Sequence, residues 1–248
     1  MNFSVFLSLL AISGVTIFQS SLEANQTRDS SQFPLLSLID EGDFYSQVSQ
    51  DKFVYSILYG LLGKQDKGYY LEIGAGEPIH INNSYFFEKN LHWDGVSIDI
   101  SENLAERWYA ARKNLLLSED ATQSDYSAIL RSFPRVIDYL SLDVDGSYDV
   151  VLEKLVRAKH IFKVITIEHD FYRYGDLYRQ KERKILTGLG YHLLCSDVSQ
   201  NGCAFEDWWI HPDFFPSEIL SQLASLDLRA KNYIQIMQVI RAVVQSRQ

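Results

Sequence analysis

Short apolar runs that alternate with helix-patterned segments constrain the fold of this chain most. Each of the first five runs ends in glycine or acidic residues. Strands that alternate with helices form a parallel sheet with right-handed crossovers. The last two runs flank Asn201-Gly202, a turn signal for an antiparallel hairpin. The predicted strands are Gly68–Ile73, Trp93–Ile100, Leu115–Leu117, Val136–Val144, Phe162–Ile167, Tyr191–Cys195 and Cys203–Ile210.

The sequence therefore predicts an α/β fold, doubly wound around a mostly parallel seven-stranded sheet, with an antiparallel edge hairpin and helices on both faces. The main predicted helices are Tyr45–Leu62, Ser101–Ala111, Ser124–Phe133, Ser147–Ala158 and Arg179–Leu189. A length of 248 residues suits one well-buried domain. We expect a hydrophobic leader at 1–24, a linker at 25–44, the main domain at 45–216 and a helical extension at 217–248.

The two ends of the chain each leave alternatives open. Residues 3–18 are apolar and uncharged, as in a signal peptide or a short membrane anchor, but no Lys or Arg precedes them and Leu22-Glu23-Ala24 is a poor cleavage site. Both a cytoplasmic or membrane-associated location and export are therefore compatible with the leader. Beyond Pro216, amphipathic spacing predicts helices that either pack on the domain or form a homodimer contact.

Charge and cysteine usage restrict the partners. The chain has 23 Lys+Arg against 32 Asp+Glu, a net charge of −9, without a clustered basic stripe. Nucleic-acid binding needs clustered cations, so we expect a small molecule or a glycan as partner and no nucleic acid. Cys195 and Cys203 lie outside any zinc-type cluster. They are either two buried free thiols or a pair facing each other across the predicted hairpin.

A glycine loop follows the first predicted strand. Gly74 and Gly76 allow the backbone to pass close to a ligand. The dinucleotide template G-x-G-x-x-G requires glycine at position 79, where this chain has Ile79, and Pro78 disturbs the helix start that would hold a pyrophosphate. This departure disfavours an NAD-dependent oxidoreductase, which stays as one alternative function.

Acidic residues at the ends of the next two predicted strands indicate what the glycine loop binds. Asp99 ends the second predicted strand, where a carboxylate accepts hydrogen bonds from ribose hydroxyls. Asp120 follows the third strand and is placed to accept from an adenine amino group. Ligands bind at the carboxyl ends of strands in open α/β sheets. The order glycine loop, Asp99, Asp120 therefore predicts an adenosine site.

A second acidic group follows the fourth and fifth predicted strands. Asp143 and Asp145 lie two residues apart and would share one face if the strand continued through them. Glu168, His169 and Asp170 follow the fifth strand. We expect these side chains to converge beside the adenosine site.

Five segments together resemble the FkbM-like methyltransferases, over about residues 45 to 212. They are Ser46-Gln47-Val48-Ser49-Gln50-Asp51, Leu71-Glu72-Ile73-Gly74-Ala75-Gly76, Asp138-Tyr139-Leu140-Ser141-Leu142-Asp143-Val144-Asp145-Gly146, Val164-Ile165-Thr166-Ile167-Glu168-His169 and Asp207-Trp208-Trp209. The resemblance implies a Rossmann-like class I methyltransferase fold that binds S-adenosylmethionine and methylates a hydroxyl oxygen of a sugar, glycan or small molecule. It further implies that Glu72, Gly74 and Gly76 hold the methionine end, that Asp99 holds the ribose, and that Glu119, Asp120 and Ala121 hold the adenine.

Methyl transfer needs an aligned acceptor oxygen and a group that removes its proton. We expect His169 to be the general base, with Asp143 as the other candidate. Asp143, Asp145 and Glu168 either orient the hydroxyl directly or hold Mg²⁺, which prefers oxygen ligands. The aromatic residues expected either to wall the acceptor site or to pack in the core are Tyr172, Tyr174, Trp208 and Trp209. The alternative from another class is a catalytically silent, exported or membrane-tethered binding module with the same fold.

Overall fold

The structure, a computed structural model, describes residues 43–247, and the predicted leader and nearly all of the predicted linker lie outside this range. The strands are β1 (Tyr69–Ile73), β2 (Asp94–Asp99), β3 (Leu115–Ser118), β4 (Val136–Leu142), β5 (Ile161–Glu168), β6 (His192–Gln200) and β7 (Cys203–Ile210). The helices are α2 (Gln50–Tyr55), the π-helix η2 (Ser56–Leu61), α3 (Tyr85–Leu91), α4 (Leu104–Ala111), α5 (Tyr126–Ile129), α6 (Tyr148–Ala158), α7 (Phe171–Tyr174), α8 (Asp176–Gly188), the 3₁₀ turn η3 (Pro212–Phe214), α9 (Ser217–Ala224) and α10 (Tyr233–Gln245).

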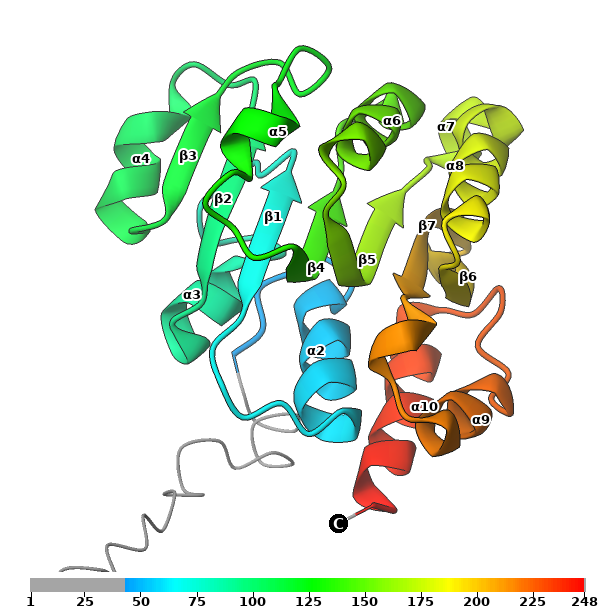
Figure 1. The fold of residues 1–248 in the computed structure, drawn as a ribbon. Helices are drawn as coiled ribbons and strands as arrows, with labels where there is room; N and C mark the ends of the chain where they lie inside the picture. Colours follow the sequence, from blue (N-terminus) through cyan, green and yellow to red (C-terminus); the bar gives the residue numbers. More distant parts are fainter. Residues whose placement is uncertain (1–42, 248) are drawn as a thin grey trace, which may run out of the picture. The chain divides into compact units, whose positions relative to one another are not determined.

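The strands form a seven-stranded sheet in the order β3-β2-β1-β4-β5-β7-β6 (Figure 1). Neighbours from β3 to β5 pair in parallel, whereas β7 runs antiparallel to both β5 and β6. The order reverses between β1 and β4, which is where an open α/β sheet binds its ligand. This topology is the Rossmann-like class I methyltransferase fold, so the predicted fold class is confirmed.

Period-two alternation along the strands distributes their side chains between two helical layers. On β4, Leu140 joins a core cluster with α5, α6 and α8, whereas its neighbour Tyr139 faces Phe87 of α3, with ring centroids 5.6 Å apart. On β7, Trp209 joins the first cluster and Trp208 packs on Phe53 of α2 at 4.4 Å. Helices α6 and α8 therefore cover one face and α2 and α3 the other (Figure 1).

The first predicted helix begins later than its apolar pattern indicates. Helix α2 begins at Gln50, because the Asp51 carboxylate accepts hydrogen bonds from the backbone amides of Tyr45 and Ser46, at 2.6 and 3.2 Å, and from the Ser46 hydroxyl. Ser49 takes a left-handed conformation with φ 67°. Side chains of this kind offer backbone amides an alternative to the helix. The residues before Gln50 therefore form a compact turn.

The predicted hairpin is present, with Asn201 and Gly202 both at positive φ, as its tight turn requires. Strand β6 extends to Gln200, beyond the predicted end at Cys195. Both cysteines are free, Cys195 being buried and Cys203 exposed. Two free thiols were one of the predicted alternatives, but the expectation that both are buried is wrong for Cys203, which lies next to the exposed turn.

The C-terminal helices belong to the same compact unit as the sheet. Helix α10 contacts α2, η2 and β6, and it buries Ile236, Ile240 and Val244 completely. Packing on the domain is thus the role of its apolar face, while the homodimer stays a prediction. Within residues 43–247 no helix is both long and apolar enough to cross a membrane.

Gly74 fixes the junction of the central strands. Its amide donates to the Ile98 carbonyl at 2.8 Å, and the Asp143 amide donates to the Ile73 carbonyl at 2.8 Å. Gly74 has φ +82°, and a Cβ there would lie 1.4 Å from the Asp143 carbonyl oxygen. Glycine is therefore required on steric grounds where β1 meets the end of β4.

Gly74→Ala is expected to lower the free energy of unfolding by more than about 4 kcal/mol, because the clash is with backbone and cannot be relieved by a rotamer change. Gly76→Ala is the matched control: φ is +57° but no atom lies within 4 Å of its added Cβ. The control is expected to lose only roughly 1–2 kcal/mol. Urea unfolding of both variants measures the difference, and equal losses would contradict the steric explanation.

Candidate functional site

The glycine loop and Asp99 meet at the ends of β1 and β2. The Asp99 carboxylate accepts hydrogen bonds from the amides of Gly76 and Ser101, both at 2.8 Å. Asp99 is partly exposed, and each carboxylate oxygen has a second acceptor position. The loop is therefore held in place by the same carboxylate that is predicted to hold the ribose.

Glu72, which is predicted to hold the methionine end, lies just before the glycine loop on β1. Its carboxylate is buried and accepts hydrogen bonds from the hydroxyls of Ser84 and Ser97, at 2.7 and 2.8 Å, and from the Asn83 amide at 3.1 Å. Burial raises its pKa, against the opposing effect of Arg112. Glu72 thus anchors the segment between β1 and α3 from within, and its contact with a cofactor stays a prediction.

The end of β3 supplies the third part of the predicted adenosine site. Glu119 donates its backbone amide to the Asp99 carbonyl at 3.0 Å, which joins this loop to β2. The Asp120 carboxylate accepts from the Thr122 amide and hydroxyl, at 2.8 and 2.7 Å, so it shapes its own turn. Ala121 is partly exposed. The backbone after β3 therefore lies against the end of β2, as the prediction requires.

Ile100 follows Asp99 directly and is 71% exposed. A large apolar side chain left in water beside an acidic nucleotide-type loop offers a surface on which a flat ring can pack. Sequence reasoning missed this residue, because an apolar residue at the end of a predicted strand was assigned to the strand itself. Its position after Asp99 was the available signal.

A cleft of about 390 Å³ lies beside this edge, at the ends of β4 and β5. Its charged lining consists of carboxylates from Asp143, Asp145, Glu168 and Asp170. The remaining lining residues are Gln47, Tyr172, Gln200, Cys203 and Phe205. The structure therefore brings the predicted Asp143, Asp145 and Glu168 to one cavity. Asp170, which was also predicted to converge with them, joins them from the turn that follows β5.

Asp143 and Glu168 form a hydrogen-bonded pair at the base of the cleft. Burial raises the pKa of both groups above their ordinary values, and the nearby charge of Asp143 raises the pKa of Glu168 further. The pair therefore holds one proton between its two carboxyl groups at neutral pH. Such a pair is a stronger base than an exposed carboxylate, because its ionised form is poorly solvated.

Glu206 is a further buried acid that sequence reasoning missed. It lies opposite Glu168 in the β5–β7 register and accepts a hydrogen bond from the Gln50 carboxamide at 3.0 Å. Burial raises its pKa well above the usual value. A glutamate within the apolar run of β7 was the signal. Gln47, in the polar segment before α2, lines the cleft and donates its side-chain amide to Gln200 at 3.1 Å.

Asp145 does not share a face with Asp143 through a continued strand. Strand β4 ends at Leu142, and Asp145 has φ 52°, with its carboxylate 3.4 Å from Arg173. Over the part of the chain that the structure describes, the set of three ligand-type side chains with atoms within 4.8 Å of one another is His169, Asp197 and Asp207. Asp143, Asp145 and Glu168 do not form such a set among the described residues, and their binding of Mg²⁺ stays a prediction.

His169 lies away from the cleft. Its side chain has no exposed area, and its Nδ1 is 3.2 Å from the Phe171 amide, which can only donate. Nδ1 is therefore an acceptor already in use, and the imidazole proton is on Nε2. Neither nitrogen is free to take a proton from an acceptor molecule. Of the two predicted candidates for the general base, Asp143 is the one that lines the cleft, and its role stays a prediction.

The four predicted aromatic residues divide between surface and core. Tyr172 is 62% exposed and lines the cleft. Tyr174 donates its hydroxyl to the Asp145 carbonyl at 2.9 Å, so it supports the loop after β4. Trp208 and Trp209 are completely buried on opposite faces of β7. The core-packing alternative describes both tryptophans.

Comparisons with known proteins find similarity in the fold alone. No family model and no curated protein sequence matches the chain. Magnesium protoporphyrin IX methyltransferase from Synechocystis PCC 6803, solved with bound SAM, has 14% identity and a TM-score of 0.44 over 73% of this chain and 90% of its own.

Two further solved structures give similar values. An rRNA methylase from Streptococcus thermophilus has 9% identity and a TM-score of 0.44 over 64% of this chain and 95% of its own. The N-methyltransferase NodS from Bradyrhizobium japonicum WM9, in complex with S-adenosylhomocysteine, has 12% identity and a TM-score of 0.41 over 67% and 89%. Likeness at this level says nothing about activity. Membership of the FkbM-like family stays a prediction.

The acidic cleft is expected to discriminate between reagents by charge. Cys203 lines the cleft and is exposed, whereas Cys195 is buried. A cationic thiosulfonate should modify Cys203 about tenfold faster than an anionic one, after each rate is divided by the rate with free cysteine, because clustered carboxylates concentrate cations. Mass spectrometry follows the reaction, with Cys203→Ser as the control. A ratio near unity would contradict a negative cleft.

Proposed function

We propose that the chain is an S-adenosylmethionine-dependent methyltransferase that methylates a hydroxyl oxygen of a sugar, a glycan or another small molecule. The observation that carries this proposal is the shared edge of β1, β2 and β3, where the Gly74–Gly76 loop, Asp99 and the Glu119–Ala121 backbone are hydrogen-bonded to one another. The acidic cleft lies at the adjoining strand ends. A donor pocket and an acceptor pocket side by side are what group transfer requires.

The residues of the chain fit the cofactor in shape and charge. The loop backbone has room beside Gly76, where nothing lies within 4 Å of an added Cβ. Asp99 is placed to accept hydrogen bonds from the ribose hydroxyls, and Ile100 offers an apolar face to the adenine. When bound, S-adenosylmethionine would supply the methyl group on a positively charged sulfur. The neighbouring carboxylates favour a cation there.

Asp143 and Glu168 act on the acceptor in this proposal. The acceptor hydroxyl hydrogen-bonds to the carboxyl pair, which would receive the hydroxyl proton when the bound cofactor supplies its methyl group to the oxygen. Tyr172 and Phe205 provide apolar surface on the cleft wall. The same carboxylates disfavour anionic acceptors, because like charges repel in a cleft. The acceptor is therefore proposed to be neutral or cationic at its binding edge.

Asp99→Asn is expected to weaken binding of S-adenosylhomocysteine about tenfold or more, because it removes charge-assisted hydrogen bonds to the ribose. Asp94→Asn is the matched control at the other end of β2, where Asp94 pairs with exposed Lys67 at 2.6 Å. Isothermal titration calorimetry measures both. Binding of NADH in place of S-adenosylhomocysteine by the wild-type protein would favour the oxidoreductase alternative. Binding of neither compound would favour the catalytically silent binding module.

Asp143→Asn is expected to leave the affinity for S-adenosylhomocysteine within about twofold and to lower methyl transfer by about 10²-fold or more, because it removes the proposed base. Transfer of label from radioactive S-adenosylmethionine to a panel of sugars and other hydroxyl compounds measures the rate. The wild-type rate should fall as pH is lowered through the raised pKa of the Asp143–Glu168 pair, since protonation removes the base. Full activity of the variant would exclude Asp143 from the role.

A further inference from the structure

The turn after β5 points successive side chains in opposite directions. Glu168 and Asp170 line the acidic cleft, whereas His169 between them is completely buried. The amides of His169 and Asp170 both donate to the Phe205 carbonyl, at 2.7 and 3.0 Å. Period-two alternation places His169 on the same side of the sheet as Asp207 of β7. The imidazole is thus directed into the protein, behind the two cleft carboxylates.

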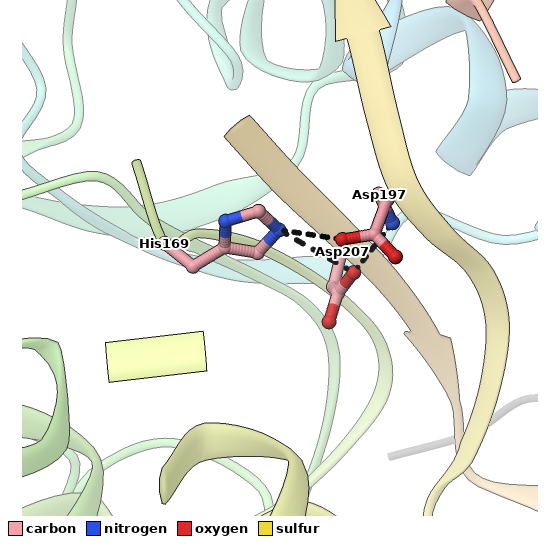
Figure 2. Close-up of side chains that lie close together, drawn as sticks. All are labelled: His169, Asp197 and Asp207. Carbon is pink, nitrogen blue, oxygen red and sulfur yellow. Dashed lines mark hydrogen bonds and ion pairs between the residues drawn. The ribbon is translucent and has the colours of Figure 1, made fainter. Parts of the chain in front are cut away.

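The imidazole of His169 is oriented by a group on each side. Nδ1 accepts from the Phe171 amide at 3.2 Å. Nε2, which carries the proton, faces the carboxylates of Asp207 and Asp197 at 3.6 and 3.9 Å (Figure 2). These distances are longer than a direct hydrogen bond. The contact is therefore an attraction between the N–H dipole and two fixed carboxylates rather than a short bond.

The carboxylates are themselves held in place. Arg183 of α8 bonds both oxygens of Asp207, at 2.7 and 2.8 Å, and the Asp197 amide donates to Asp207 at 2.8 Å. Arg179 of α8 donates to Asp197 at 2.6 Å. Although burial opposes it, the bond from Arg183 and the nearby His169 hold the pKa of Asp207 below its usual range. Asp207 is therefore an ionised, immobile acceptor.

The His169, Asp197 and Asp207 group has the spacing of a metal site but not its chemistry. Its ligand-type atoms lie within 4.8 Å of one another. Two guanidinium groups already neutralise the carboxylates. A metal on Nε2 would also move the imidazole proton to Nδ1, where it would face the Phe171 N–H. Both features oppose a cation at this position.

We propose that His169 is a positioning residue, whose imidazole joins the Glu168–Asp170 turn to Asp207 and so fixes both cleft carboxylates in place. This inference rests on the proposed function, because it assigns the cleft to the acceptor. Arg183 and Arg179 connect the same network to α8, and Asp197 connects it to β6. His169 thus acts through Glu168 and Asp170 and does not touch the reacting atoms.

Two variants separate positioning from other roles. His169→Asn keeps an oxygen that can accept from the Phe171 amide, a local bond that Asn side chains commonly make, and an N–H₂ group on the Asp207 side. His169→Leu removes both. The charge selectivity of Cys203 modification reports the carboxylate positions, and calorimetry with S-adenosylhomocysteine reports the donor site at the ends of β1, β2 and β3. Nitrogen NMR of the wild-type imidazole reports its tautomer and does not depend on either variant.

The ratio of the cationic to the anionic rate of Cys203 modification is expected to stay within about twofold of the wild-type value in the Asn variant. In the Leu variant it is expected to fall at least about threefold, since displaced carboxylates act on the thiol from farther away. Both should bind S-adenosylhomocysteine like the wild type. The NMR spectrum should show the proton on Nε2, with no change when Zn²⁺ is added.

Three results would each overturn the positioning role. They are a Cys203 rate ratio in the folded Leu variant equal to that of the wild type, an imidazole proton on Nδ1, and a change in the imidazole NMR signals when Zn²⁺ is added. If the Leu variant does not fold, the wild-type tautomer and the ratio in the Asn variant decide. Failure of the wild-type protein to bind S-adenosylhomocysteine would instead sink the methyltransferase proposal. The tautomer and the Cys203 ratios would still test the role of His169.

Discussion

The close approach of Gly74 to the Asp143 carbonyl is the constraint on which the rest of the site depends. Backbone hydrogen bonds join Gly74 to β2 and Asp143 to β1. Only glycine at position 74 permits so short a distance between its Cα and the Asp143 carbonyl oxygen. The donor loop and the first carboxylate of the cleft are consequently adjacent. Their relative position is set by backbone, which is more rigid than any pair of side chains.

Buried carboxylates are the second organising feature. Glu72, Asp143, Glu168 and Glu206 all lie along one edge of the sheet with raised pKa values, because burial disfavours their charged forms. Glu72 is stabilised by hydroxyl and amide donors, whereas Asp143 and Glu168 rely mainly on each other. A carboxylate whose hydrogen bonds are all made within the protein, such as Glu72, suits a structural role. A pair that shares a proton, such as Asp143 and Glu168, suits the exchange of protons with a ligand.

The sequence predicted the strand ends better than the directions of the side chains beyond them. Asp99, Asp143 and Glu168 were placed correctly at the carboxyl edge because strand order follows from the alternation of strands and helices. Asp145 reaches the cleft as predicted, although not through a continued strand, whereas His169 lies outside it. Asp145 takes a left-handed backbone conformation after the strand has ended, and period-two alternation turns His169 inward. Both effects act after the strand ends, where apolar patterning carries no information.

The sequence by itself determined the α/β class, the hairpin at Asn201-Gly202 and the glycine loop with its acidic followers, because these follow from local patterning and turn chemistry. Only the tertiary structure decided which acids share the cleft and that His169 is buried outside it. Glu206 reaches Glu168 through strand pairing, and Asp207 reaches His169 through the antiparallel β7. Such contacts join residues nearly 40 apart in the chain, and no local pattern records a distance of that kind.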